Sequence, residues 1–74
     1  MAAKQHVLSA EEAVKVFRAF GWMVACRGSS HIIMAKAGKH VTLSIPNQLE
    51  LGGGVLRSLI RSARLKEEEF AAAK

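Results

Sequence analysis

The first predicted helix follows from apolar positions that recur every three or four residues shortly after residue 9. Its apolar side is formed by Ala13, Val14, Phe17 and Phe20. Ser9 stands three residues before Glu12, which is the spacing of a capping box at a helix N-terminus. Gly21 follows the last apolar position, and glycine is the residue that most often ends a helix. The pattern predicts an amphipathic helix that begins after Ser9 and ends at Gly21.

The middle of the chain is predicted to form three short strands. These segments are apolar or rich in β-branched residues and run from Trp22 to Arg27, from Ser30 to Lys36 and from His40 to Ile45. Gly28-Ser29 and Ala37-Gly38 are turn signals between them. Pro46 ends the third strand, because proline cannot donate to a ladder. Turns this short join antiparallel neighbours.

A second amphipathic helix is predicted after the loop at 47–54, which finishes in three glycines. Its apolar positions are Val55, Leu56, Leu59, Ile60 and Ala63. A stripe on its polar side carries Arg57, Arg61 and Arg64. A short terminal helix begins around Lys66 and includes Phe70.

The predicted fold class is α+β, in the order helix, three-stranded antiparallel meander, helix. Two helices on one face of such a sheet leave the other face in contact with water. A length of 74 residues fits a single domain over 1–74. The double-stranded-RNA-binding domain (dsRBD) has the same α-β-β-β-α layout, so the fold favours RNA by analogy.

The two faces of the sheet are predicted by counting outward from the turns. Two-residue turns place His31 opposite Ser44, His40 opposite Ala35, Ile33 opposite Thr42, and Cys26 opposite His31. Ile32 and Met34 share the other, more apolar face, which is the expected core face. His31 and His40 are therefore expected on the open face, and a one-residue slip would reverse this assignment.

The charge balance narrows the class of partner. Lys and Arg number 11 against 6 for Asp and Glu, which gives a formal net charge of +5. Such a field favours nucleic acid, and an acidic protein partner is the alternative. One cysteine excludes an internal disulfide framework, and no zinc-type pairing of His and Cys is seen, so neither a metal nor another cofactor is expected. No secretory leader or long apolar run is seen, which favours a cytoplasmic protein with no membrane span.

His31 is the candidate catalytic residue. Histidine titrates near neutral pH, so on an open, basic sheet face it can exchange protons with ribose and phosphate oxygens. RNA carries its own nucleophile in the 2′-hydroxyl, so a base with electrostatic support is sufficient without a metal. The alternative is a strand histidine with no role, and this interpretation applies equally to His6 and His40.

Several further residues are candidates for contacting RNA. They are Arg27, Ser29, Lys36, Lys39, His40, Arg57 and Arg61. The cationic side chains would attract the phosphate backbone, whereas the alternative for the arginine stripe is a solvated helix face. The glycines at 52–54 are read as a flexible lead-in to a helix rather than an anion site. Trp22 is expected to pack in the core or against a partner rather than on a base.

Five blocks of residues stand in a familiar order and spacing. They are Gly21-Trp22, Arg27 to His31, Ile45-Pro46, Gly54 to Arg61, and Glu68-Glu69-Phe70. Together they resemble the HicA (YcfA-like) family of mRNA interferase toxins of type II toxin–antitoxin systems. The resemblance runs from about Ser9 to Phe70. The Gly-Ser-x-His element is weak by itself, but five blocks in one short chain are specific.

The resemblance implies a dsRBD-like fold, metal-independent mRNA cleavage that arrests translation, and inhibition by a HicB antitoxin that covers the active site. It also implies that His31 is the catalytic residue, with Gly28 and Ser29 shaping the turn before it. The chain departs from the pattern at Gln48, because many relatives carry a histidine two residues after the proline. If that histidine assists catalysis, this chain is slower or uses His40 instead.

Two functions from different classes follow. The first is a ribonuclease toxin that uses His31, and the second is a non-catalytic dsRBD-like RNA-binding module or degenerate toxin. Charge, fold and the arginine stripe fit both, and only His31 within its motif favours the first. A DNA-binding domain fits less well, because a three-strand meander replaces the helix-turn-helix layout. The expected assembly is a monomer alone or a hetero-oligomer with the antitoxin.

Overall fold

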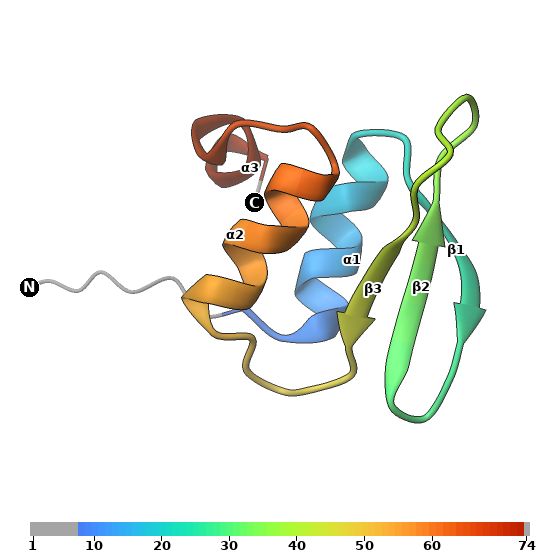
Figure 1. Ribbon diagram of the computed structural model, residues 1–74. Helices are drawn as coiled ribbons and strands as arrows, with labels where there is room; N and C mark the ends of the chain where they lie inside the picture. The colour runs from blue at the N-terminus through green and yellow to red at the C-terminus, as the bar shows by residue number, and fades with distance from the viewer. Residues whose placement is uncertain (1–7, 74) are drawn as a thin grey trace, which may run out of the picture.

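The computed structural model describes residues 8–73, so His6 lies outside the described part. The elements in chain order are α1 (Ala10–Ala19), β1 (Met23–Arg27), β2 (His31–Ala35), β3 (Leu43–Pro46), α2 (Gly53–Ser62) and α3 (Glu67–Ala72). The strands form one antiparallel sheet in the order β1-β2-β3. Helices α1 and α2 lie side by side on one side of this sheet (Figure 1). The predicted α+β class with a dsRBD-like α-β-β-β-α order is confirmed, with α3 as an addition at the C-terminal end.

Helix α1 begins and ends as its sequence predicts. The Ser9 hydroxyl accepts a hydrogen bond from the Glu12 N–H at 3.1 Å, and the Glu12 carboxylate accepts one from the Ser9 N–H at 2.9 Å. At the other end Gly21 has φ +96°. The Gly21 N–H bonds to the Arg18 carbonyl and the Trp22 N–H to the Phe17 carbonyl, which together form a Schellman motif.

The connection between β2 and β3 is longer than the predicted two-residue turn. Residues 36–42 lie outside the strands, and the third strand starts at Leu43 rather than His40. The pairing is therefore displaced by two residues, so that His31 faces Pro46 and Ser44 faces Ile33. Because side chains alternate with a period of two, a two-residue displacement keeps every residue on its predicted face. The predicted partners were wrong, but Ile32 is buried and His31 exposed, as expected.

The pairing of β1 with β2 also differs from the prediction. Cys26 faces Ile33 rather than His31, again a displacement by two, because Ser30 belongs to the turn instead of to β2. An irregularity between Val24 and Cys26 then changes the register along the edge strand. A bulge of this kind bends an edge strand and makes it a poorer template for pairing with another chain.

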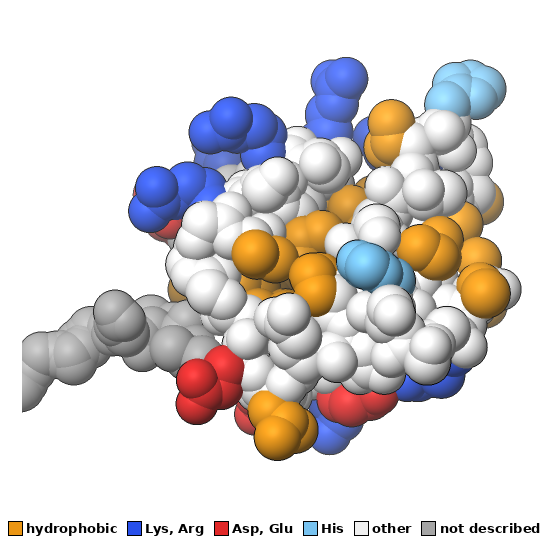
Figure 2. Space-filling model, turned by 60° about the horizontal axis from the view of Figure 1, so that its bottom comes forward, with side chains coloured by type: hydrophobic (Ala, Val, Ile, Leu, Met, Phe, Trp, Pro, Cys, Tyr) orange, Lys and Arg blue, Asp and Glu red, His pale blue; other side chains and the backbone are white. Residues whose placement is uncertain are grey.

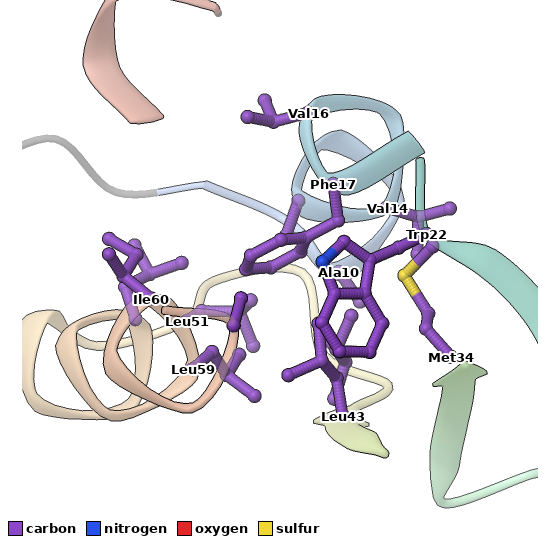
Figure 3. Packing of buried hydrophobic residues seen from close by; sticks show 14 of the residues in the cluster. Ala10, Val14, Val16, Phe17, Trp22, Met34, Leu43, Leu51, Leu59 and Ile60 are labelled. Carbon is purple, nitrogen blue, oxygen red and sulfur yellow. The ribbon is translucent and has the colours of Figure 1, made fainter. Parts of the chain in front are cut away.

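The core lies between the helices and the covered face of the sheet. Its largest fully buried side chains are Trp22, Phe17, Ile32, Met34, Leu43, Ile45 and Leu51. The rings of Phe17 and Trp22 lie near its centre (Figure 3), and Phe70 of α3 packs on Phe17 with ring centroids 5.1 Å apart. Trp22 is thus a core residue, as predicted. Its indole N–H finds no hydrogen-bond acceptor among residues 8–73.

Helix α2 starts earlier than predicted and ends unusually. Gly53 and Gly54 belong to its first turn, whereas the sequence pattern predicts them in the preceding loop. After Ser62 the Leu65 N–H bonds to the Ile60 carbonyl and the Arg64 N–H to the Arg61 carbonyl, each at 3.0 Å. This is a second Schellman motif, but the left-handed position, with φ +62°, is occupied by Arg64 instead of glycine.

Candidate active site and candidate nucleic-acid interface

His31 stands exposed at the first position of β2, on the face of the sheet that the helices leave open. Its backbone is fixed on both sides. The Gly28 N–H donates to the His31 carbonyl at 2.8 Å, closing the β1–β2 turn. A Cβ atom added at Gly28 would lie 3.2 Å from the same carbonyl oxygen, so the close approach favours glycine. The turn therefore holds the backbone of His31 in a defined position. Gly28 shapes this turn, as the resemblance implies.

Asn47 ties the end of β3 to this turn. Its N–H donates to the Ser30 carbonyl at 2.8 Å, and its Nδ2 lies 3.5 Å from the Ser29 carbonyl oxygen. The next residue, Gln48, accepts a hydrogen bond from the Ala10 N–H at 2.9 Å, which links the same loop to the start of α1. Asn47 was not singled out from the sequence, where its position directly after Pro46 was the only available signal.

The surroundings of His31 on the open face are neutral. The residues that the register places on this face are Met23, Cys26, Ile33, Ala35, Ser44 and Pro46. Met23 is 70% exposed. Figure 2 shows hydrophobic and uncharged side chains over the middle of its view and the Lys and Arg side chains at the margins. The expectation of a basic sheet face was wrong, because the basic residues point elsewhere.

Two of the arginines predicted to contact RNA are engaged in ion pairs. Arg27 faces Ile32 in the ladder, on the helix side of the sheet, and its guanidinium contacts both carboxylate oxygens of Glu11 at 2.6 and 3.2 Å. These hydrogen bonds from Arg27 lower the pKa of the Glu11 carboxyl below its ordinary value and raise that of Arg27. The Nε atom of Arg57 lies 3.3 Å from the carboxylate Oε2 atom of Glu67 at the start of α3.

The remaining predicted contacts gather at the other end of β2. Lys36 packs its side chain along Gly21, with Cε 3.2 Å from where a Cβ would stand. Lys39, His40 and Arg61 line one groove together with Arg64, which the sequence placed on the arginine stripe but not at a site. Since β2 is five residues long, this end lies at least about 13 Å from His31. His40 therefore cannot share a single proton-transfer step with His31.

Ser29 is the one predicted RNA-contacting residue beside His31. It occupies the β1–β2 turn, and its carbonyl oxygen faces the Asn47 amide. Within residues 8–73 no group of three or more His, Cys, Asp or Glu side chains is arranged to hold a metal ion. The site thus offers an exposed imidazole, the polar groups of one turn and a neutral sheet surface. This arrangement can exchange a proton with a bound molecule, while binding through charge must involve residues farther away.

Comparison with known proteins addresses the family directly. Searches of curated proteins and of solved structures gave no match. None of the helices in the described part of the chain has the length and apolar character needed to cross a membrane. The family model described as the HicA toxin of bacterial toxin–antitoxin systems matches residues 10–65. That span runs from the first residue of α1 past the end of α2 and includes the whole sheet and His31. The chain therefore belongs to the HicA toxin family, whose members are the toxin components of toxin–antitoxin systems.

Proposed function

We propose that this toxin is a metal-independent endoribonuclease that cleaves mRNA in the cytoplasm, with His31 as its catalytic residue. One observation carries the proposal: the imidazole is exposed on the open sheet face and is held by a turn whose backbone is fixed by Gly28 and Asn47. Precise backbone placement matters, because a general acid or base must lie within hydrogen-bond reach of the proton that it transfers.

The chemistry uses the 2′-hydroxyl of RNA as the nucleophile. The 2′-oxygen attacks the adjacent phosphorus and loses its proton, and the bond from phosphorus to the 5′-oxygen of the next nucleotide breaks. That oxygen takes up a proton, so the products are a 2′,3′-cyclic phosphate and a 5′-hydroxyl. His31 acts in one of two ways, either accepting the 2′-hydroxyl proton or protonating the leaving oxygen, and water handles the other transfer.

The partner proposed for this toxin is a HicB-like antitoxin that covers His31. The open sheet face supports a protein partner, because the partly buried Pro46 and Ile33 lie beside the histidine, and Ala35 and the exposed Met23 continue the apolar surface to the other end of β2. The depletion of charge around His31 is also the pattern found at the centre of protein interfaces. A bound antitoxin would remove the imidazole from solvent and from RNA.

A non-catalytic RNA-binding module remains the second candidate, and one observation favours it. No charged side chain shares the open face with His31 in the described strands, and Gln48 stands where many relatives carry a histidine. An isolated imidazole without a second acid or base gives a smaller rate enhancement than a pair. The two candidates differ only in whether RNA is cut.

The test is cleavage of a 5′-labelled mRNA by the purified chain in the presence of EDTA. His31→Ala removes the proposed catalyst, and Lys15→Gln is the control, since it changes an exposed side chain of α1 and leaves both the open sheet face and the β2–β3 loop intact. We expect the parent chain and Lys15→Gln to yield 2′,3′-cyclic phosphate ends and His31→Ala to be inactive while folded by circular dichroism. Products with 5′-phosphates that form only with Mg²⁺, or equal cleavage by His31→Ala, would refute the proposal. A folded parent chain that binds RNA without cutting it would establish the module.

A further inference from the structure

A groove lies between the β2–β3 loop and the C-terminal end of α2, with a volume of about 550 Å³. Its lining consists of Gly38, Lys39, His40, Val41, Thr42, Arg61, Ser62 and Arg64. Three of these side chains are cationic, two carry hydroxyl groups and none is acidic. We call this feature the loop–helix groove. It lies at the opposite end of β2 from His31.

The cations of the loop–helix groove are not neutralised by their neighbours. In the described part of the chain the ion pairs join Arg27 to Glu11 and Arg57 to Glu67. Lys39, Arg61 and Arg64 form no ion pair with any described carboxylate. A second groove, between α2 and the start of α3, is different, because Glu67 and Glu68 line it beside Arg57 and Arg61. The loop–helix groove therefore has cationic side chains and no acidic one, whereas the second groove has both signs of charge.

Arg64 occupies a backbone position that disfavours it. Both α1 and α2 end in a Schellman motif, and the left-handed residue is Gly21 in the first and Arg64 in the second. Arg64 is the one non-glycine residue with positive φ among residues 8–73. No hydrogen bond or ion pair of its side chain compensates for this strain within that range. Uncompensated strain at a single residue is typical of functional positions.

We propose that the loop–helix groove binds the phosphodiester backbone of the RNA substrate at a subsite separate from the site of cleavage. Arginine guanidinium groups bind phosphate oxygens through paired N–H donors, and hydroxyl groups such as those of Thr42 and Ser62 are common additional donors. The inference rests on RNA being the substrate but not on its cleavage by His31. In this arrangement the RNA strand is bound through charge at the groove, and it is cleaved at the neutral end of the sheet.

Affinity for single-stranded RNA measured against salt concentration tests the groove. A His31→Ala background keeps the probe, an oligomer of about 12 nucleotides, intact during titration by fluorescence anisotropy. Each phosphate contact contributes about −0.7 to the slope of log affinity against log salt for single strands. Arg61→Gln and Arg64→Gly should each flatten the slope by about 0.7 and weaken binding several-fold at low salt. Lys15→Gln removes one charge from the exposed side of α1, outside the groove, and should leave the slope unchanged.

Three outcomes would overturn the inference. Unchanged slopes in both groove variants would exclude phosphate contacts in the groove. An equal effect of Lys15→Gln would show that RNA binding depends on the net charge of the protein and not on the groove. Groove variants that bind RNA normally but lose affinity for an acidic protein partner would reassign the surface. The assay does not depend on catalysis. If the groove variants lose RNA affinity while the parent chain cuts no RNA, the proposed nuclease activity fails and the groove stands.

Discussion

Arg64→Gly is expected to make the protein more stable while it weakens RNA binding. The backbone of Arg64 has φ +62° in the Schellman motif after α2, where its Cβ is unfavourable. Glycine carries no Cβ and is the usual residue at this position. The substitution therefore removes strain from the folded state and a guanidinium from the loop–helix groove at the same time.

The gain in the free energy of unfolding follows from two opposing effects. A left-handed conformation costs an L-residue about 1–2 kcal/mol, and glycine relieves this cost. Glycine also has more freedom in the unfolded chain, which offsets about 0.5–1 kcal/mol of the gain. The net stabilisation is about 0.5–1 kcal/mol, which raises Tm by about 2–8 °C in a domain of this size.

Thermal unfolding followed by circular dichroism at fixed pH and salt measures this gain. Arg64→Ala is the matched control, because it removes the same guanidinium but keeps the Cβ and hence the strain. We expect Arg64→Ala to shift the free energy of unfolding by less than about 0.5 kcal/mol. If Gly and Ala raise Tm equally, the effect comes from losing a positive charge. If Gly lowers Tm, the left-handed residue is not strained and the reasoning about Arg64 fails.

The other predictions concern the N-terminal end of α1 and the loop after Pro46. Because Arg27 lowers the pKa of Glu11, the pair stabilises the protein above the ordinary carboxyl pKa, and this stability is lost as pH falls through the lowered pKa. Glu11→Gln should flatten that part of the Tm–pH profile, and a parent profile equally flat would contradict the pairing. Ser9→Ala should cost about 1 kcal/mol in unfolding measured with urea, since it removes the helix cap. Gln48→His should speed RNA cleavage by up to about 10²-fold, and a gain that persists in a His31→Ala background would show that the two positions act independently.

The sequence predicted the face of His31 correctly although its pairing was wrong. Two-residue turns were assumed on both sides of β2, whereas the residues between β2 and β3 form a longer connection. Both displacements were even, so His31 stayed on the open face and Ile32 stayed in the core. What fixes this outcome is burial: an odd slip would have exposed Ile32 and Met34 and buried the histidine. Side-chain alternation was therefore a safer guide than turn length.

Side-chain alternation did not predict the position of His40. Its place before a β-branched run predicts a strand, yet the run pairs only from Leu43 onward. Residues 39–42 have no apolar alternation that a core could enforce, and Val41 is 49% exposed. His40 consequently lies in the loop and lines the groove rather than facing Ala35. Without burial to specify a register, a propensity for strand is not sufficient to form one.

The positions of the cations were the least predictable part of the site, because the number of charged residues does not show which of them form ion pairs. A net charge of +5 indicates a polyanion, but two of the arginines expected to bind it are paired with glutamates 16 and ten positions away in the chain. Periodicity placed Arg61 and Arg64 on one stripe with Arg57, whereas the end of α2 at Ser62 turns Arg64 toward the β2–β3 loop. The structure thereby pairs Arg27 and Arg57 with glutamates and leaves Lys39, Arg61 and Arg64 of the groove without an ion pair to a described carboxylate. The unpaired set is the one whose loss should change the salt dependence of RNA binding.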